Sequence, residues 1–138
     1  MPIKQISVFL ENNAGRLAEV TEVLARADIN LRAIAIADTA DFGILRLIVD
    51  KEAEAVQALT GAGFTTRETQ VAAVEIDDTP GGLAGVMKIF KEYNINIEYL
   101  YASLEHKSGK AVVVFRLEDI ERGIAIIKEK GLSMIEKF

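Results

Sequence analysis

The feature that most constrains the fold of this chain is an internal repeat. A segment that ends an alternating apolar run, turns on a glycine and opens a helical pattern occurs at residues 11–20 and again at residues 77–86. The two copies are 66 positions apart (81 − 15), and the offset becomes 68 after a polar loop near residue 105. The chain therefore consists of two tandem copies of one unit. Matching pairs are Gly15 with Gly81, Leu17 with Leu83, Asn30 with Asn96, Leu59 with Ile127 and Gly63 with Gly131.

The repeat divides the chain into two domains, residues 1–70 and residues 71–138. A domain of about 70 residues has only a marginally stable core when it stands alone. We therefore expect the two halves to pack side by side.

The first half shows the order strand, helix, strand, strand, helix, strand. Ile6, Val8 and Leu10 alternate with other residues, which is typical of a strand. Apolar residues then recur at helical spacing up to residue 27, and a turn at residues 38–43 separates two further apolar runs. A second helix is predicted over residues 51–62 and a closing strand over residues 65–71.

The second half repeats this order without a flexible linker, because residues 69–76 run directly from one predicted strand into the next. A helix follows the turn, then a hairpin of residues 96–104 and 111–117, a second helix, and a final strand at residues 132–138. The predicted fold class is α+β, with two ferredoxin-like βαββαβ units packed side by side and their helices on one face.

Charge and composition exclude several kinds of partner. The net charge is −5, and Lys and Arg form no cluster that could bind nucleic acid or an anionic membrane. No apolar run approaches the length of about 18 residues that a membrane helix needs. The chain has no cysteine, which fits the reducing cytoplasm and leaves no thiolate for catalysis. We expect a cytoplasmic protein without a cofactor.

The repeated turn has a structural and a functional explanation. Asn12 or Asn13 suits the cap of the following helix, Pro80 suits a first helical turn, and the glycines permit tight turns. In the functional explanation, the unpaired N–H groups of each helix start, at residues 15–17 and 81–83, bind a ligand carboxylate. Both explanations stay open at the level of the sequence.

The doubled pattern resembles the ACT domain family, here as a tandem pair. Each unit has an acidic or amide residue before an (Ala/Pro)-Gly-x-Leu turn, and an Ile-Asn-(Leu/Ile) motif at the start of its second strand. The resemblance covers nearly the whole chain. It implies a regulatory fold whose members commonly bind amino acids at the interface of two units.

The resemblance also implies a ligand set. In members that bind a free amino acid, the residue two before the turn proline and the Asn of the second strand bracket the ligand. The chain departs from such members at Ala14, which replaces the turn proline, and at Leu10 and Ile76, which replace a histidine. The predicted ligand-binding residues are Asn12, Asn13, Gly15, Leu17, Asn30, Asp78, Gly81, Leu83 and Asn96.

Asn side chains offer both donors and acceptors to a zwitterion, whereas an ionised Asp78 offers acceptors only. We expect one site to combine the Asn12 turn with Asn96 and another to combine the Asp78 turn with Asn30. The alternative for Asn30 and Asn96 is that both are turn residues between helix and strand.

No residue pattern indicates catalysis. The single His106 lies in a polar loop, and the carboxylates of Asp77 and Asp78, or of Asp38 and Asp41, have no His or Cys at metal-ligand spacing. Capping and solvation explain these carboxylates. We therefore predict neither an enzyme nor a metal site.

The predicted function is regulation through a small-molecule ligand, an amino acid, held at the interface between two ACT units. We also expect a homodimer and a metabolic enzyme as partner. The alternative is a structural or interaction module that assembles with an enzyme and binds no ligand. RNA binding through the same topology would need exposed aromatic residues on the third strand, but residues 44–49 contain none.

Overall fold

The computed structural model describes residues 2–11, 13–38, 42–104 and 108–138. The order βαββαβ occurs twice along an α+β chain, as the repeat predicts. The chain forms two compact units, which we call the N-terminal unit (Lys4–Thr69) and the C-terminal unit (Gln70–Phe138, with Pro2 and Ile3).

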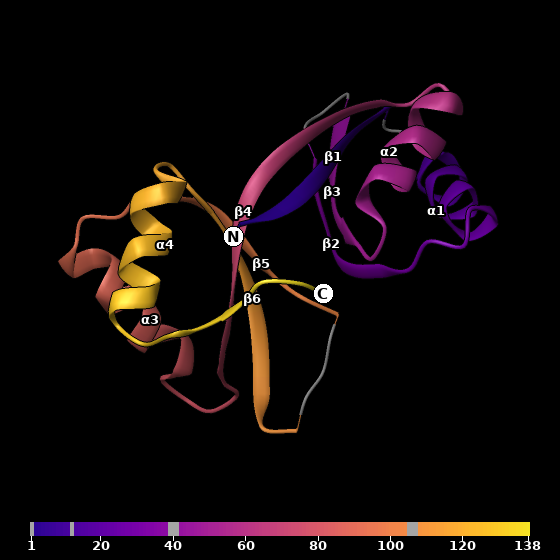
Figure 1. Cartoon of the computed structure of the whole chain (residues 1–138). Coiled ribbons are helices and arrows are strands. Elements are labelled where there is room, and N and C mark those ends of the chain that lie inside the picture. The colour runs from indigo at the N-terminus through magenta and orange to yellow at the C-terminus, as the bar shows by residue number, and fades with distance from the viewer. Residues whose placement is uncertain (1, 12, 39–41, 105–107) are drawn as a thin grey trace. The chain divides into compact units, whose positions relative to one another are not determined.

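In the N-terminal unit, β3 lies between β1 and β2 and pairs antiparallel with both, so that Leu47 faces Ile6 on one side and Ile34 on the other. The helices cover one face of this sheet (Figure 1). Val20 and Leu24 of the first helix are buried against the strands. The elements are β1 (Ile3–Glu11), α1 (Arg16–Arg26), β2 (Leu31–Asp38), β3 (Phe42–Val49) and α2 (Glu52–Gly61).

The strand β4 (Thr65–Asp77) is 13 residues long and passes from one unit into the other without a break (Figure 1). The absence of Pro and Gly between residues 65 and 77 favours this uninterrupted strand. Its first residues close the N-terminal unit, and its last residues open the C-terminal unit.

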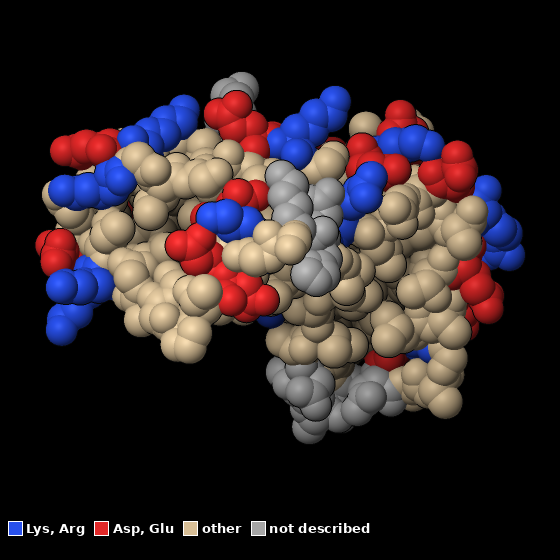
Figure 2. Space-filling model, turned by 90° about the horizontal axis from the view of Figure 1, so that it is seen from below, with Lys and Arg blue, Asp and Glu red and all other residues tan. Residues whose placement is uncertain are grey.

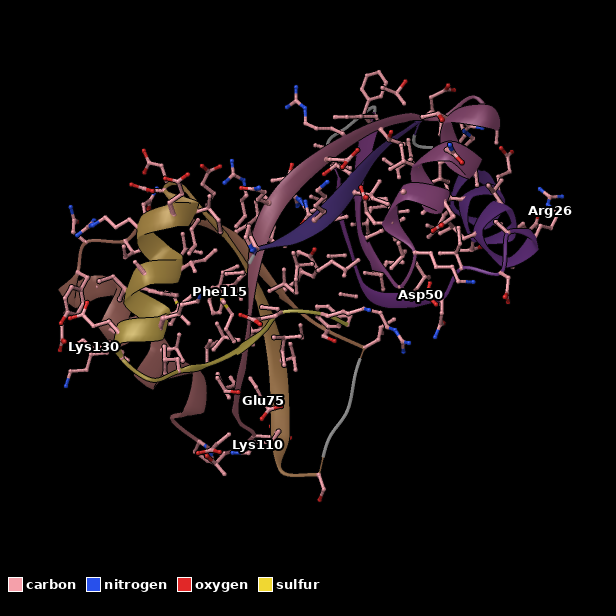
Figure 3. The ribbon with its side chains drawn as sticks, viewed as in Figure 1. Arg26, Asp50, Glu75, Lys110, Phe115 and Lys130 are labelled. Carbon is pink, nitrogen blue, oxygen red and sulfur yellow. The ribbon has the colours of Figure 1, made fainter. Side chains whose placement is uncertain are left out.

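The C-terminal unit repeats the arrangement, with β6 between β4 and β5. Phe115 of β6 points into the core (Figure 3), where its ring meets that of Phe90 edge to face at a centroid distance of 5.3 Å. The equivalent residues of the first unit are Leu24 and Leu47, so the two cores share a backbone plan but hold different side chains. The elements are α3 (Gly82–Glu92), β5 (Ile97–Ala102), β6 (Lys110–Leu117), α4 (Ile120–Glu129) and β7 (Ser133–Ile135).

The last strand is shorter than the sequence predicts. The prediction was residues 132–138, but β7 contains only Ser133–Ile135, which pair with β4. The Leu132 amide donates to the Ile127 carbonyl (3.1 Å) and so belongs to the end of α4. After Ile135 the exposed Glu136 and Lys137 provide no apolar face, and strand pairing stops there.

Candidate functional site

The turn between β1 and α1 is built on a glycine in a left-handed conformation. Gly15 is the N-cap residue of α1 with φ +86°, and no side chain among the described residues caps the helix. The Arg16 amide donates to the Asn13 carbonyl (3.3 Å), whereas the Asn13 side chain donates to a Glu11 carboxylate oxygen (3.1 Å). The prediction that Asn13 caps the helix is therefore wrong, because this side chain is turned back to the strand. Asn12 lies outside the described residues.

A pocket of ≈ 200 Å³ opens beside this turn, entirely within the N-terminal unit. Pockets for drug-sized molecules hold about 300–1,000 Å³, so this one suits a smaller metabolite. The end of the sheet and the start of α1 form its walls. The lining residues are Leu10, Glu11, Asn13, Arg16, Leu17, Ile36 and Gly43.

The pocket carries charges of both signs. Arg16 is positioned by a cation–π contact with Phe64, at 4.6 Å from the ring centroid, and by a 2.6 Å ion pair with Glu19. Its Nε atom is buried without a hydrogen-bond partner in the described part of the chain. The backbone amide of Leu17 lies in the first turn of α1, where N–H groups have no acceptor within the helix. Arg16 and Glu11, two residues of opposite charge, thus line the same pocket.

The second turn has the same backbone but different chemistry. Gly81 is the N-cap of α3 with φ +90°, so Pro80 precedes the cap and does not belong to the first helical turn that the sequence predicted. Gly82 occupies the position of Arg16, and its amide donates to the Thr79 carbonyl (3.0 Å). The second turn therefore has no guanidinium at this position.

A lysine from the neighbouring strand lies against the second turn. The Lys110 ammonium donates to the Asp77 carboxylate, and this hydrogen bond, with the negative charge of Asp77, raises the pKa of Lys110 above its ordinary value. The amide of Asp78 donates to the Gly109 carbonyl (3.0 Å). Figure 3 shows Lys110 at the start of β6, close to the end of β4. Both carboxylates of the Asp77-Asp78 pair are exposed.

Asn30 and Asn96 have matching structural roles. The carbonyl of Asn30 accepts from the Asp50 amide (3.1 Å), and the Asn30 amide donates to the Asp50 carboxylate (3.0 Å). The carbonyl of Asn96 likewise accepts from the Glu118 amide (3.0 Å), and its side chain donates to the Glu118 carboxylate (3.1 Å). Both residues thus lie just before a strand and connect its start to the residue that follows the neighbouring strand.

Asn30 is separate from the first turn of its own unit. It lines a different, more open and polar pocket of ≈ 340 Å³, which shares no residue with the pocket beside the first turn. The expected pairing of each turn with the Asn of the other unit stays a prediction. The residues that line this second pocket are Ala25, Asp28, Ile29, Asn30, Asp50 and Lys51.

Sequence reasoning missed several residues of the pocket beside the first turn. The repeated motif indicates Glu11 and Arg16 only as neighbours of the turn. Ile36 and Gly43 come from strands that are distant from the turn in sequence. The useful signal was the variable position of the Gly-x-Leu motif, which is Arg16 in one copy and Gly82 in the other. A position that differs between two copies of a motif indicates a side-chain function that only one copy can have.

The described residues contain no group of three or more His, Cys, Asp or Glu side chains that could hold a metal ion. His106 and Asp41 lie outside the described part. Among the helices that the structure describes, none has the length and apolar character needed to cross a membrane. On the face shown in Figure 2, acidic and basic side chains are intermixed.

Comparisons with known proteins identify proteins of similar sequence and fold. The family model for the ACT domain pair matches residues 1–138. Protein BT0572 from Bacteroides thetaiotaomicron is 41% identical, with a TM-score of 0.92 over 98% of this chain and 92% of that one. The regulatory subunit of aspartate kinase from Thermus thermophilus shares the fold, with a TM-score of 0.69 and 19% identity over 95% of this chain and 94% of that one. No curated protein matches the chain.

Proposed function

Because the chain belongs to the ACT domain pair family, we propose that it is a regulatory protein that binds an amino acid and relays its presence to a metabolic enzyme. The fold that it shares with a regulatory subunit of aspartate kinase supports a role beside an enzyme. In this proposal the chain acts in the cytoplasm as a homodimer and catalyses no reaction itself.

The observation that carries the proposal is the pocket beside the first turn. In an α-amino acid the carboxylate and the ammonium are both bonded to the α-carbon. This pocket offers Arg16 to the carboxylate and Glu11 to the ammonium. The first turn of α1 adds backbone donors with positive potential. Such a site discriminates a zwitterion from a simple anion or cation.

The proposed ligand residues are the turn residues and the two strand asparagines that the sequence indicated, with Glu11 and Arg16 added from the structure. Leu17 and Asn13 line the pocket directly, and Gly15 shapes the turn beside it. The remaining members of the set are Asn12, Asn30, Asp78, Gly81, Leu83 and Asn96.

Regulation requires that the ligand prefer one state of the protein over another. A ligand at 100 times its Kd raises the free energy of unfolding by about 2.7 kcal/mol. Thermal unfolding of the full chain in the presence of each standard L-amino acid therefore tests the proposal. A rise in Tm that depends on concentration is expected for at least one of them, and no rise at millimolar concentrations of any amino acid would refute amino acid binding.

One observation favours the alternative, an interaction module without a ligand. Ile36 and Phe42 are 54% and 57% exposed on neighbouring strands, and large apolar side chains at a surface often mark a protein contact. Co-purification of an enzyme with the chain, together with a Tm that no amino acid changes, would support this alternative.

A further inference from the structure

The two turns of this duplicated chain are not equivalent in charge. In the first, Arg16 lines the pocket, and its guanidinium contacts Glu19 and Phe64. In the second, Gly82 replaces the arginine, and the nearby Lys110 is paired with Asp77. Only the first turn therefore offers a ligand carboxylate a cationic side chain from its own helix.

The second turn has no room for such a side chain. A Cβ atom on Gly82 would lie 2.1 Å from the Asp77 carbonyl oxygen, which belongs to the backbone and cannot move aside without shifting β4. Any residue other than glycine is thus excluded at this position unless the turn changes. The backbone of the second turn therefore prevents it from carrying the side chain that the first turn has.

The walls of the first pocket indicate what kind of side chain the ligand has. Leu10, Leu17 and Ile36 supply apolar surface, and Leu17 and Ile36 are 41% and 54% exposed without a ligand. An aliphatic side chain would cover this surface and remove it from water. A second carboxylate on the ligand would instead meet the negative charge of Glu11, and like charges repel.

We propose that the N-terminal unit alone holds the ligand of this chain, and that the ligand is a small aliphatic α-amino acid whose carboxylate pairs with Arg16 and whose ammonium faces Glu11. This inference rests on the proposed function and narrows it to one site and one ligand class. The Glu19 carboxylate shares the guanidinium with the ligand and keeps it oriented when the pocket is empty.

Calorimetry of the full chain with L-leucine tests the site. We expect one leucine per chain, with affinity reduced roughly ten- to one-hundred-fold in Arg16→Gln, the loss typical of a charge-assisted hydrogen bond. Arg26→Gln is the matched control, because Arg26 lies at the other end of the same helix and points away from the strands (Figure 3). Lys110→Gln, on the strand beside the second turn, is the second control, and both controls should bind leucine as the unchanged chain does.

Two analogues of leucine assign the charged contacts. L-leucinamide lacks the carboxylate, so it should bind the unchanged chain weakly and lose no further affinity in Arg16→Gln. N-acetyl-L-leucine lacks the ammonium and should be insensitive to Glu11→Gln. Circular dichroism and Tm of each variant confirm that it is folded, so that weaker binding reports on the pocket.

Several results would overturn the inference while leaving amino acid binding intact. These are two leucines per chain, an affinity unchanged by Arg16→Gln but lowered by Lys110→Gln, or binding of L-aspartate or L-lysine in preference to L-leucine. If no standard amino acid binds at all, the proposed function itself fails.

Discussion

At the scale of single residues, equivalent positions of the two units resemble each other most clearly in backbone conformation. Gly15 and Gly81 have φ values of +86° and +90°, and Asp28 and Asn94 have φ values of +58° and +54°. Positive φ is costly for residues with a Cβ atom, so glycine, or Asp and Asn after a helix, recur at matching positions. The side chains beside these positions are free to differ, and at Arg16 and Gly82 they do.

This conformation gives the first prediction. Gly81→Ala should lower the free energy of unfolding by about 1–2 kcal/mol, because a Cβ atom strains a residue in the left-handed region. Chemical denaturation measures this change. Gly85→Ala is the matched control: it lies on the exposed face of α3 with open space at its Cβ and should stabilise the chain by about 1 kcal/mol. Equal effects of the two substitutions would contradict the conformational explanation.

A second prediction concerns Gly82, one residue further on. Gly82→Ala should destabilise the chain by about 1–3 kcal/mol, the usual cost of overpacking, because its Cβ would overlap the Asp77 carbonyl. Arg16→Ala at the equivalent position of the first turn should change the free energy of unfolding by less. Urea denaturation of both variants compares them, and a Gly82→Ala protein as stable as the unchanged chain would show that the turn relaxes easily.

At the scale of elements, hydrogen bonds connect the two helices of each unit, and the residues that make them differ between the units. In the N-terminal unit, Lys51 before α2 donates to the Asp28 carbonyl (2.8 Å) at the end of α1. In the C-terminal unit, Arg122 of α4 donates to the carbonyls of Tyr93 and Asn94 at the end of α3. The carbonyls at a helix end need partners, and each copy supplies a cation from a different position.

The start of α2 gives a prediction about pH. Burial raises the pKa of Glu52. A side-chain hydrogen bond with Glu68 and the negative charge of Glu68 raise this pKa further, while the positive charge of Lys4 lowers it. A carboxyl whose pKa is higher in the folded than in the unfolded chain stabilises the fold while it is protonated. This stabilisation is lost as the pH rises from the ordinary carboxyl pKa through the raised pKa of the folded chain. Glu52 therefore reduces stability at neutral pH.

Glu52→Gln should accordingly increase the free energy of unfolding at pH 7, since glutamine keeps a donor for Glu68 and adds no charge. The gain should shrink as the pH falls toward the ordinary carboxyl pKa, where Glu52 of the unchanged chain becomes protonated. Denaturation curves of both proteins at several pH values measure it. A gain that is the same at every pH would mean that the charge of Glu52 is not the cause.

At the scale of the whole molecule, the outer strands suggest self-association. In the described part of the chain, β2 pairs only with β3 and β5 only with β6, so both are edge strands. Ile36 on β2 and Leu100 on β5 are large apolar residues with considerable exposure. Exposed strand edges with apolar side chains favour pairing with another chain.

We therefore expect a homodimer. Light scattering should give a mass near twice that of one chain at micromolar concentrations, and Ile36→Lys or Leu100→Lys should shift the mass toward that of a single chain, because a lysine on an edge strand opposes pairing. A mass of one chain across this concentration range would contradict the prediction.

The order of helices and strands, the unbroken β4 and the paired glycines follow from the sequence alone, because these depend on local periodicity and on backbone conformations that few residues adopt. Which residues meet depends on the tertiary structure. It brought Leu10, Ile36 and Gly43 from three strands to the start of α1, turned Asn13 toward Glu11, and paired Lys110 with Asp77. These contacts join positions far apart in the chain or depend on side-chain direction, and neither periodicity nor spacing encodes them.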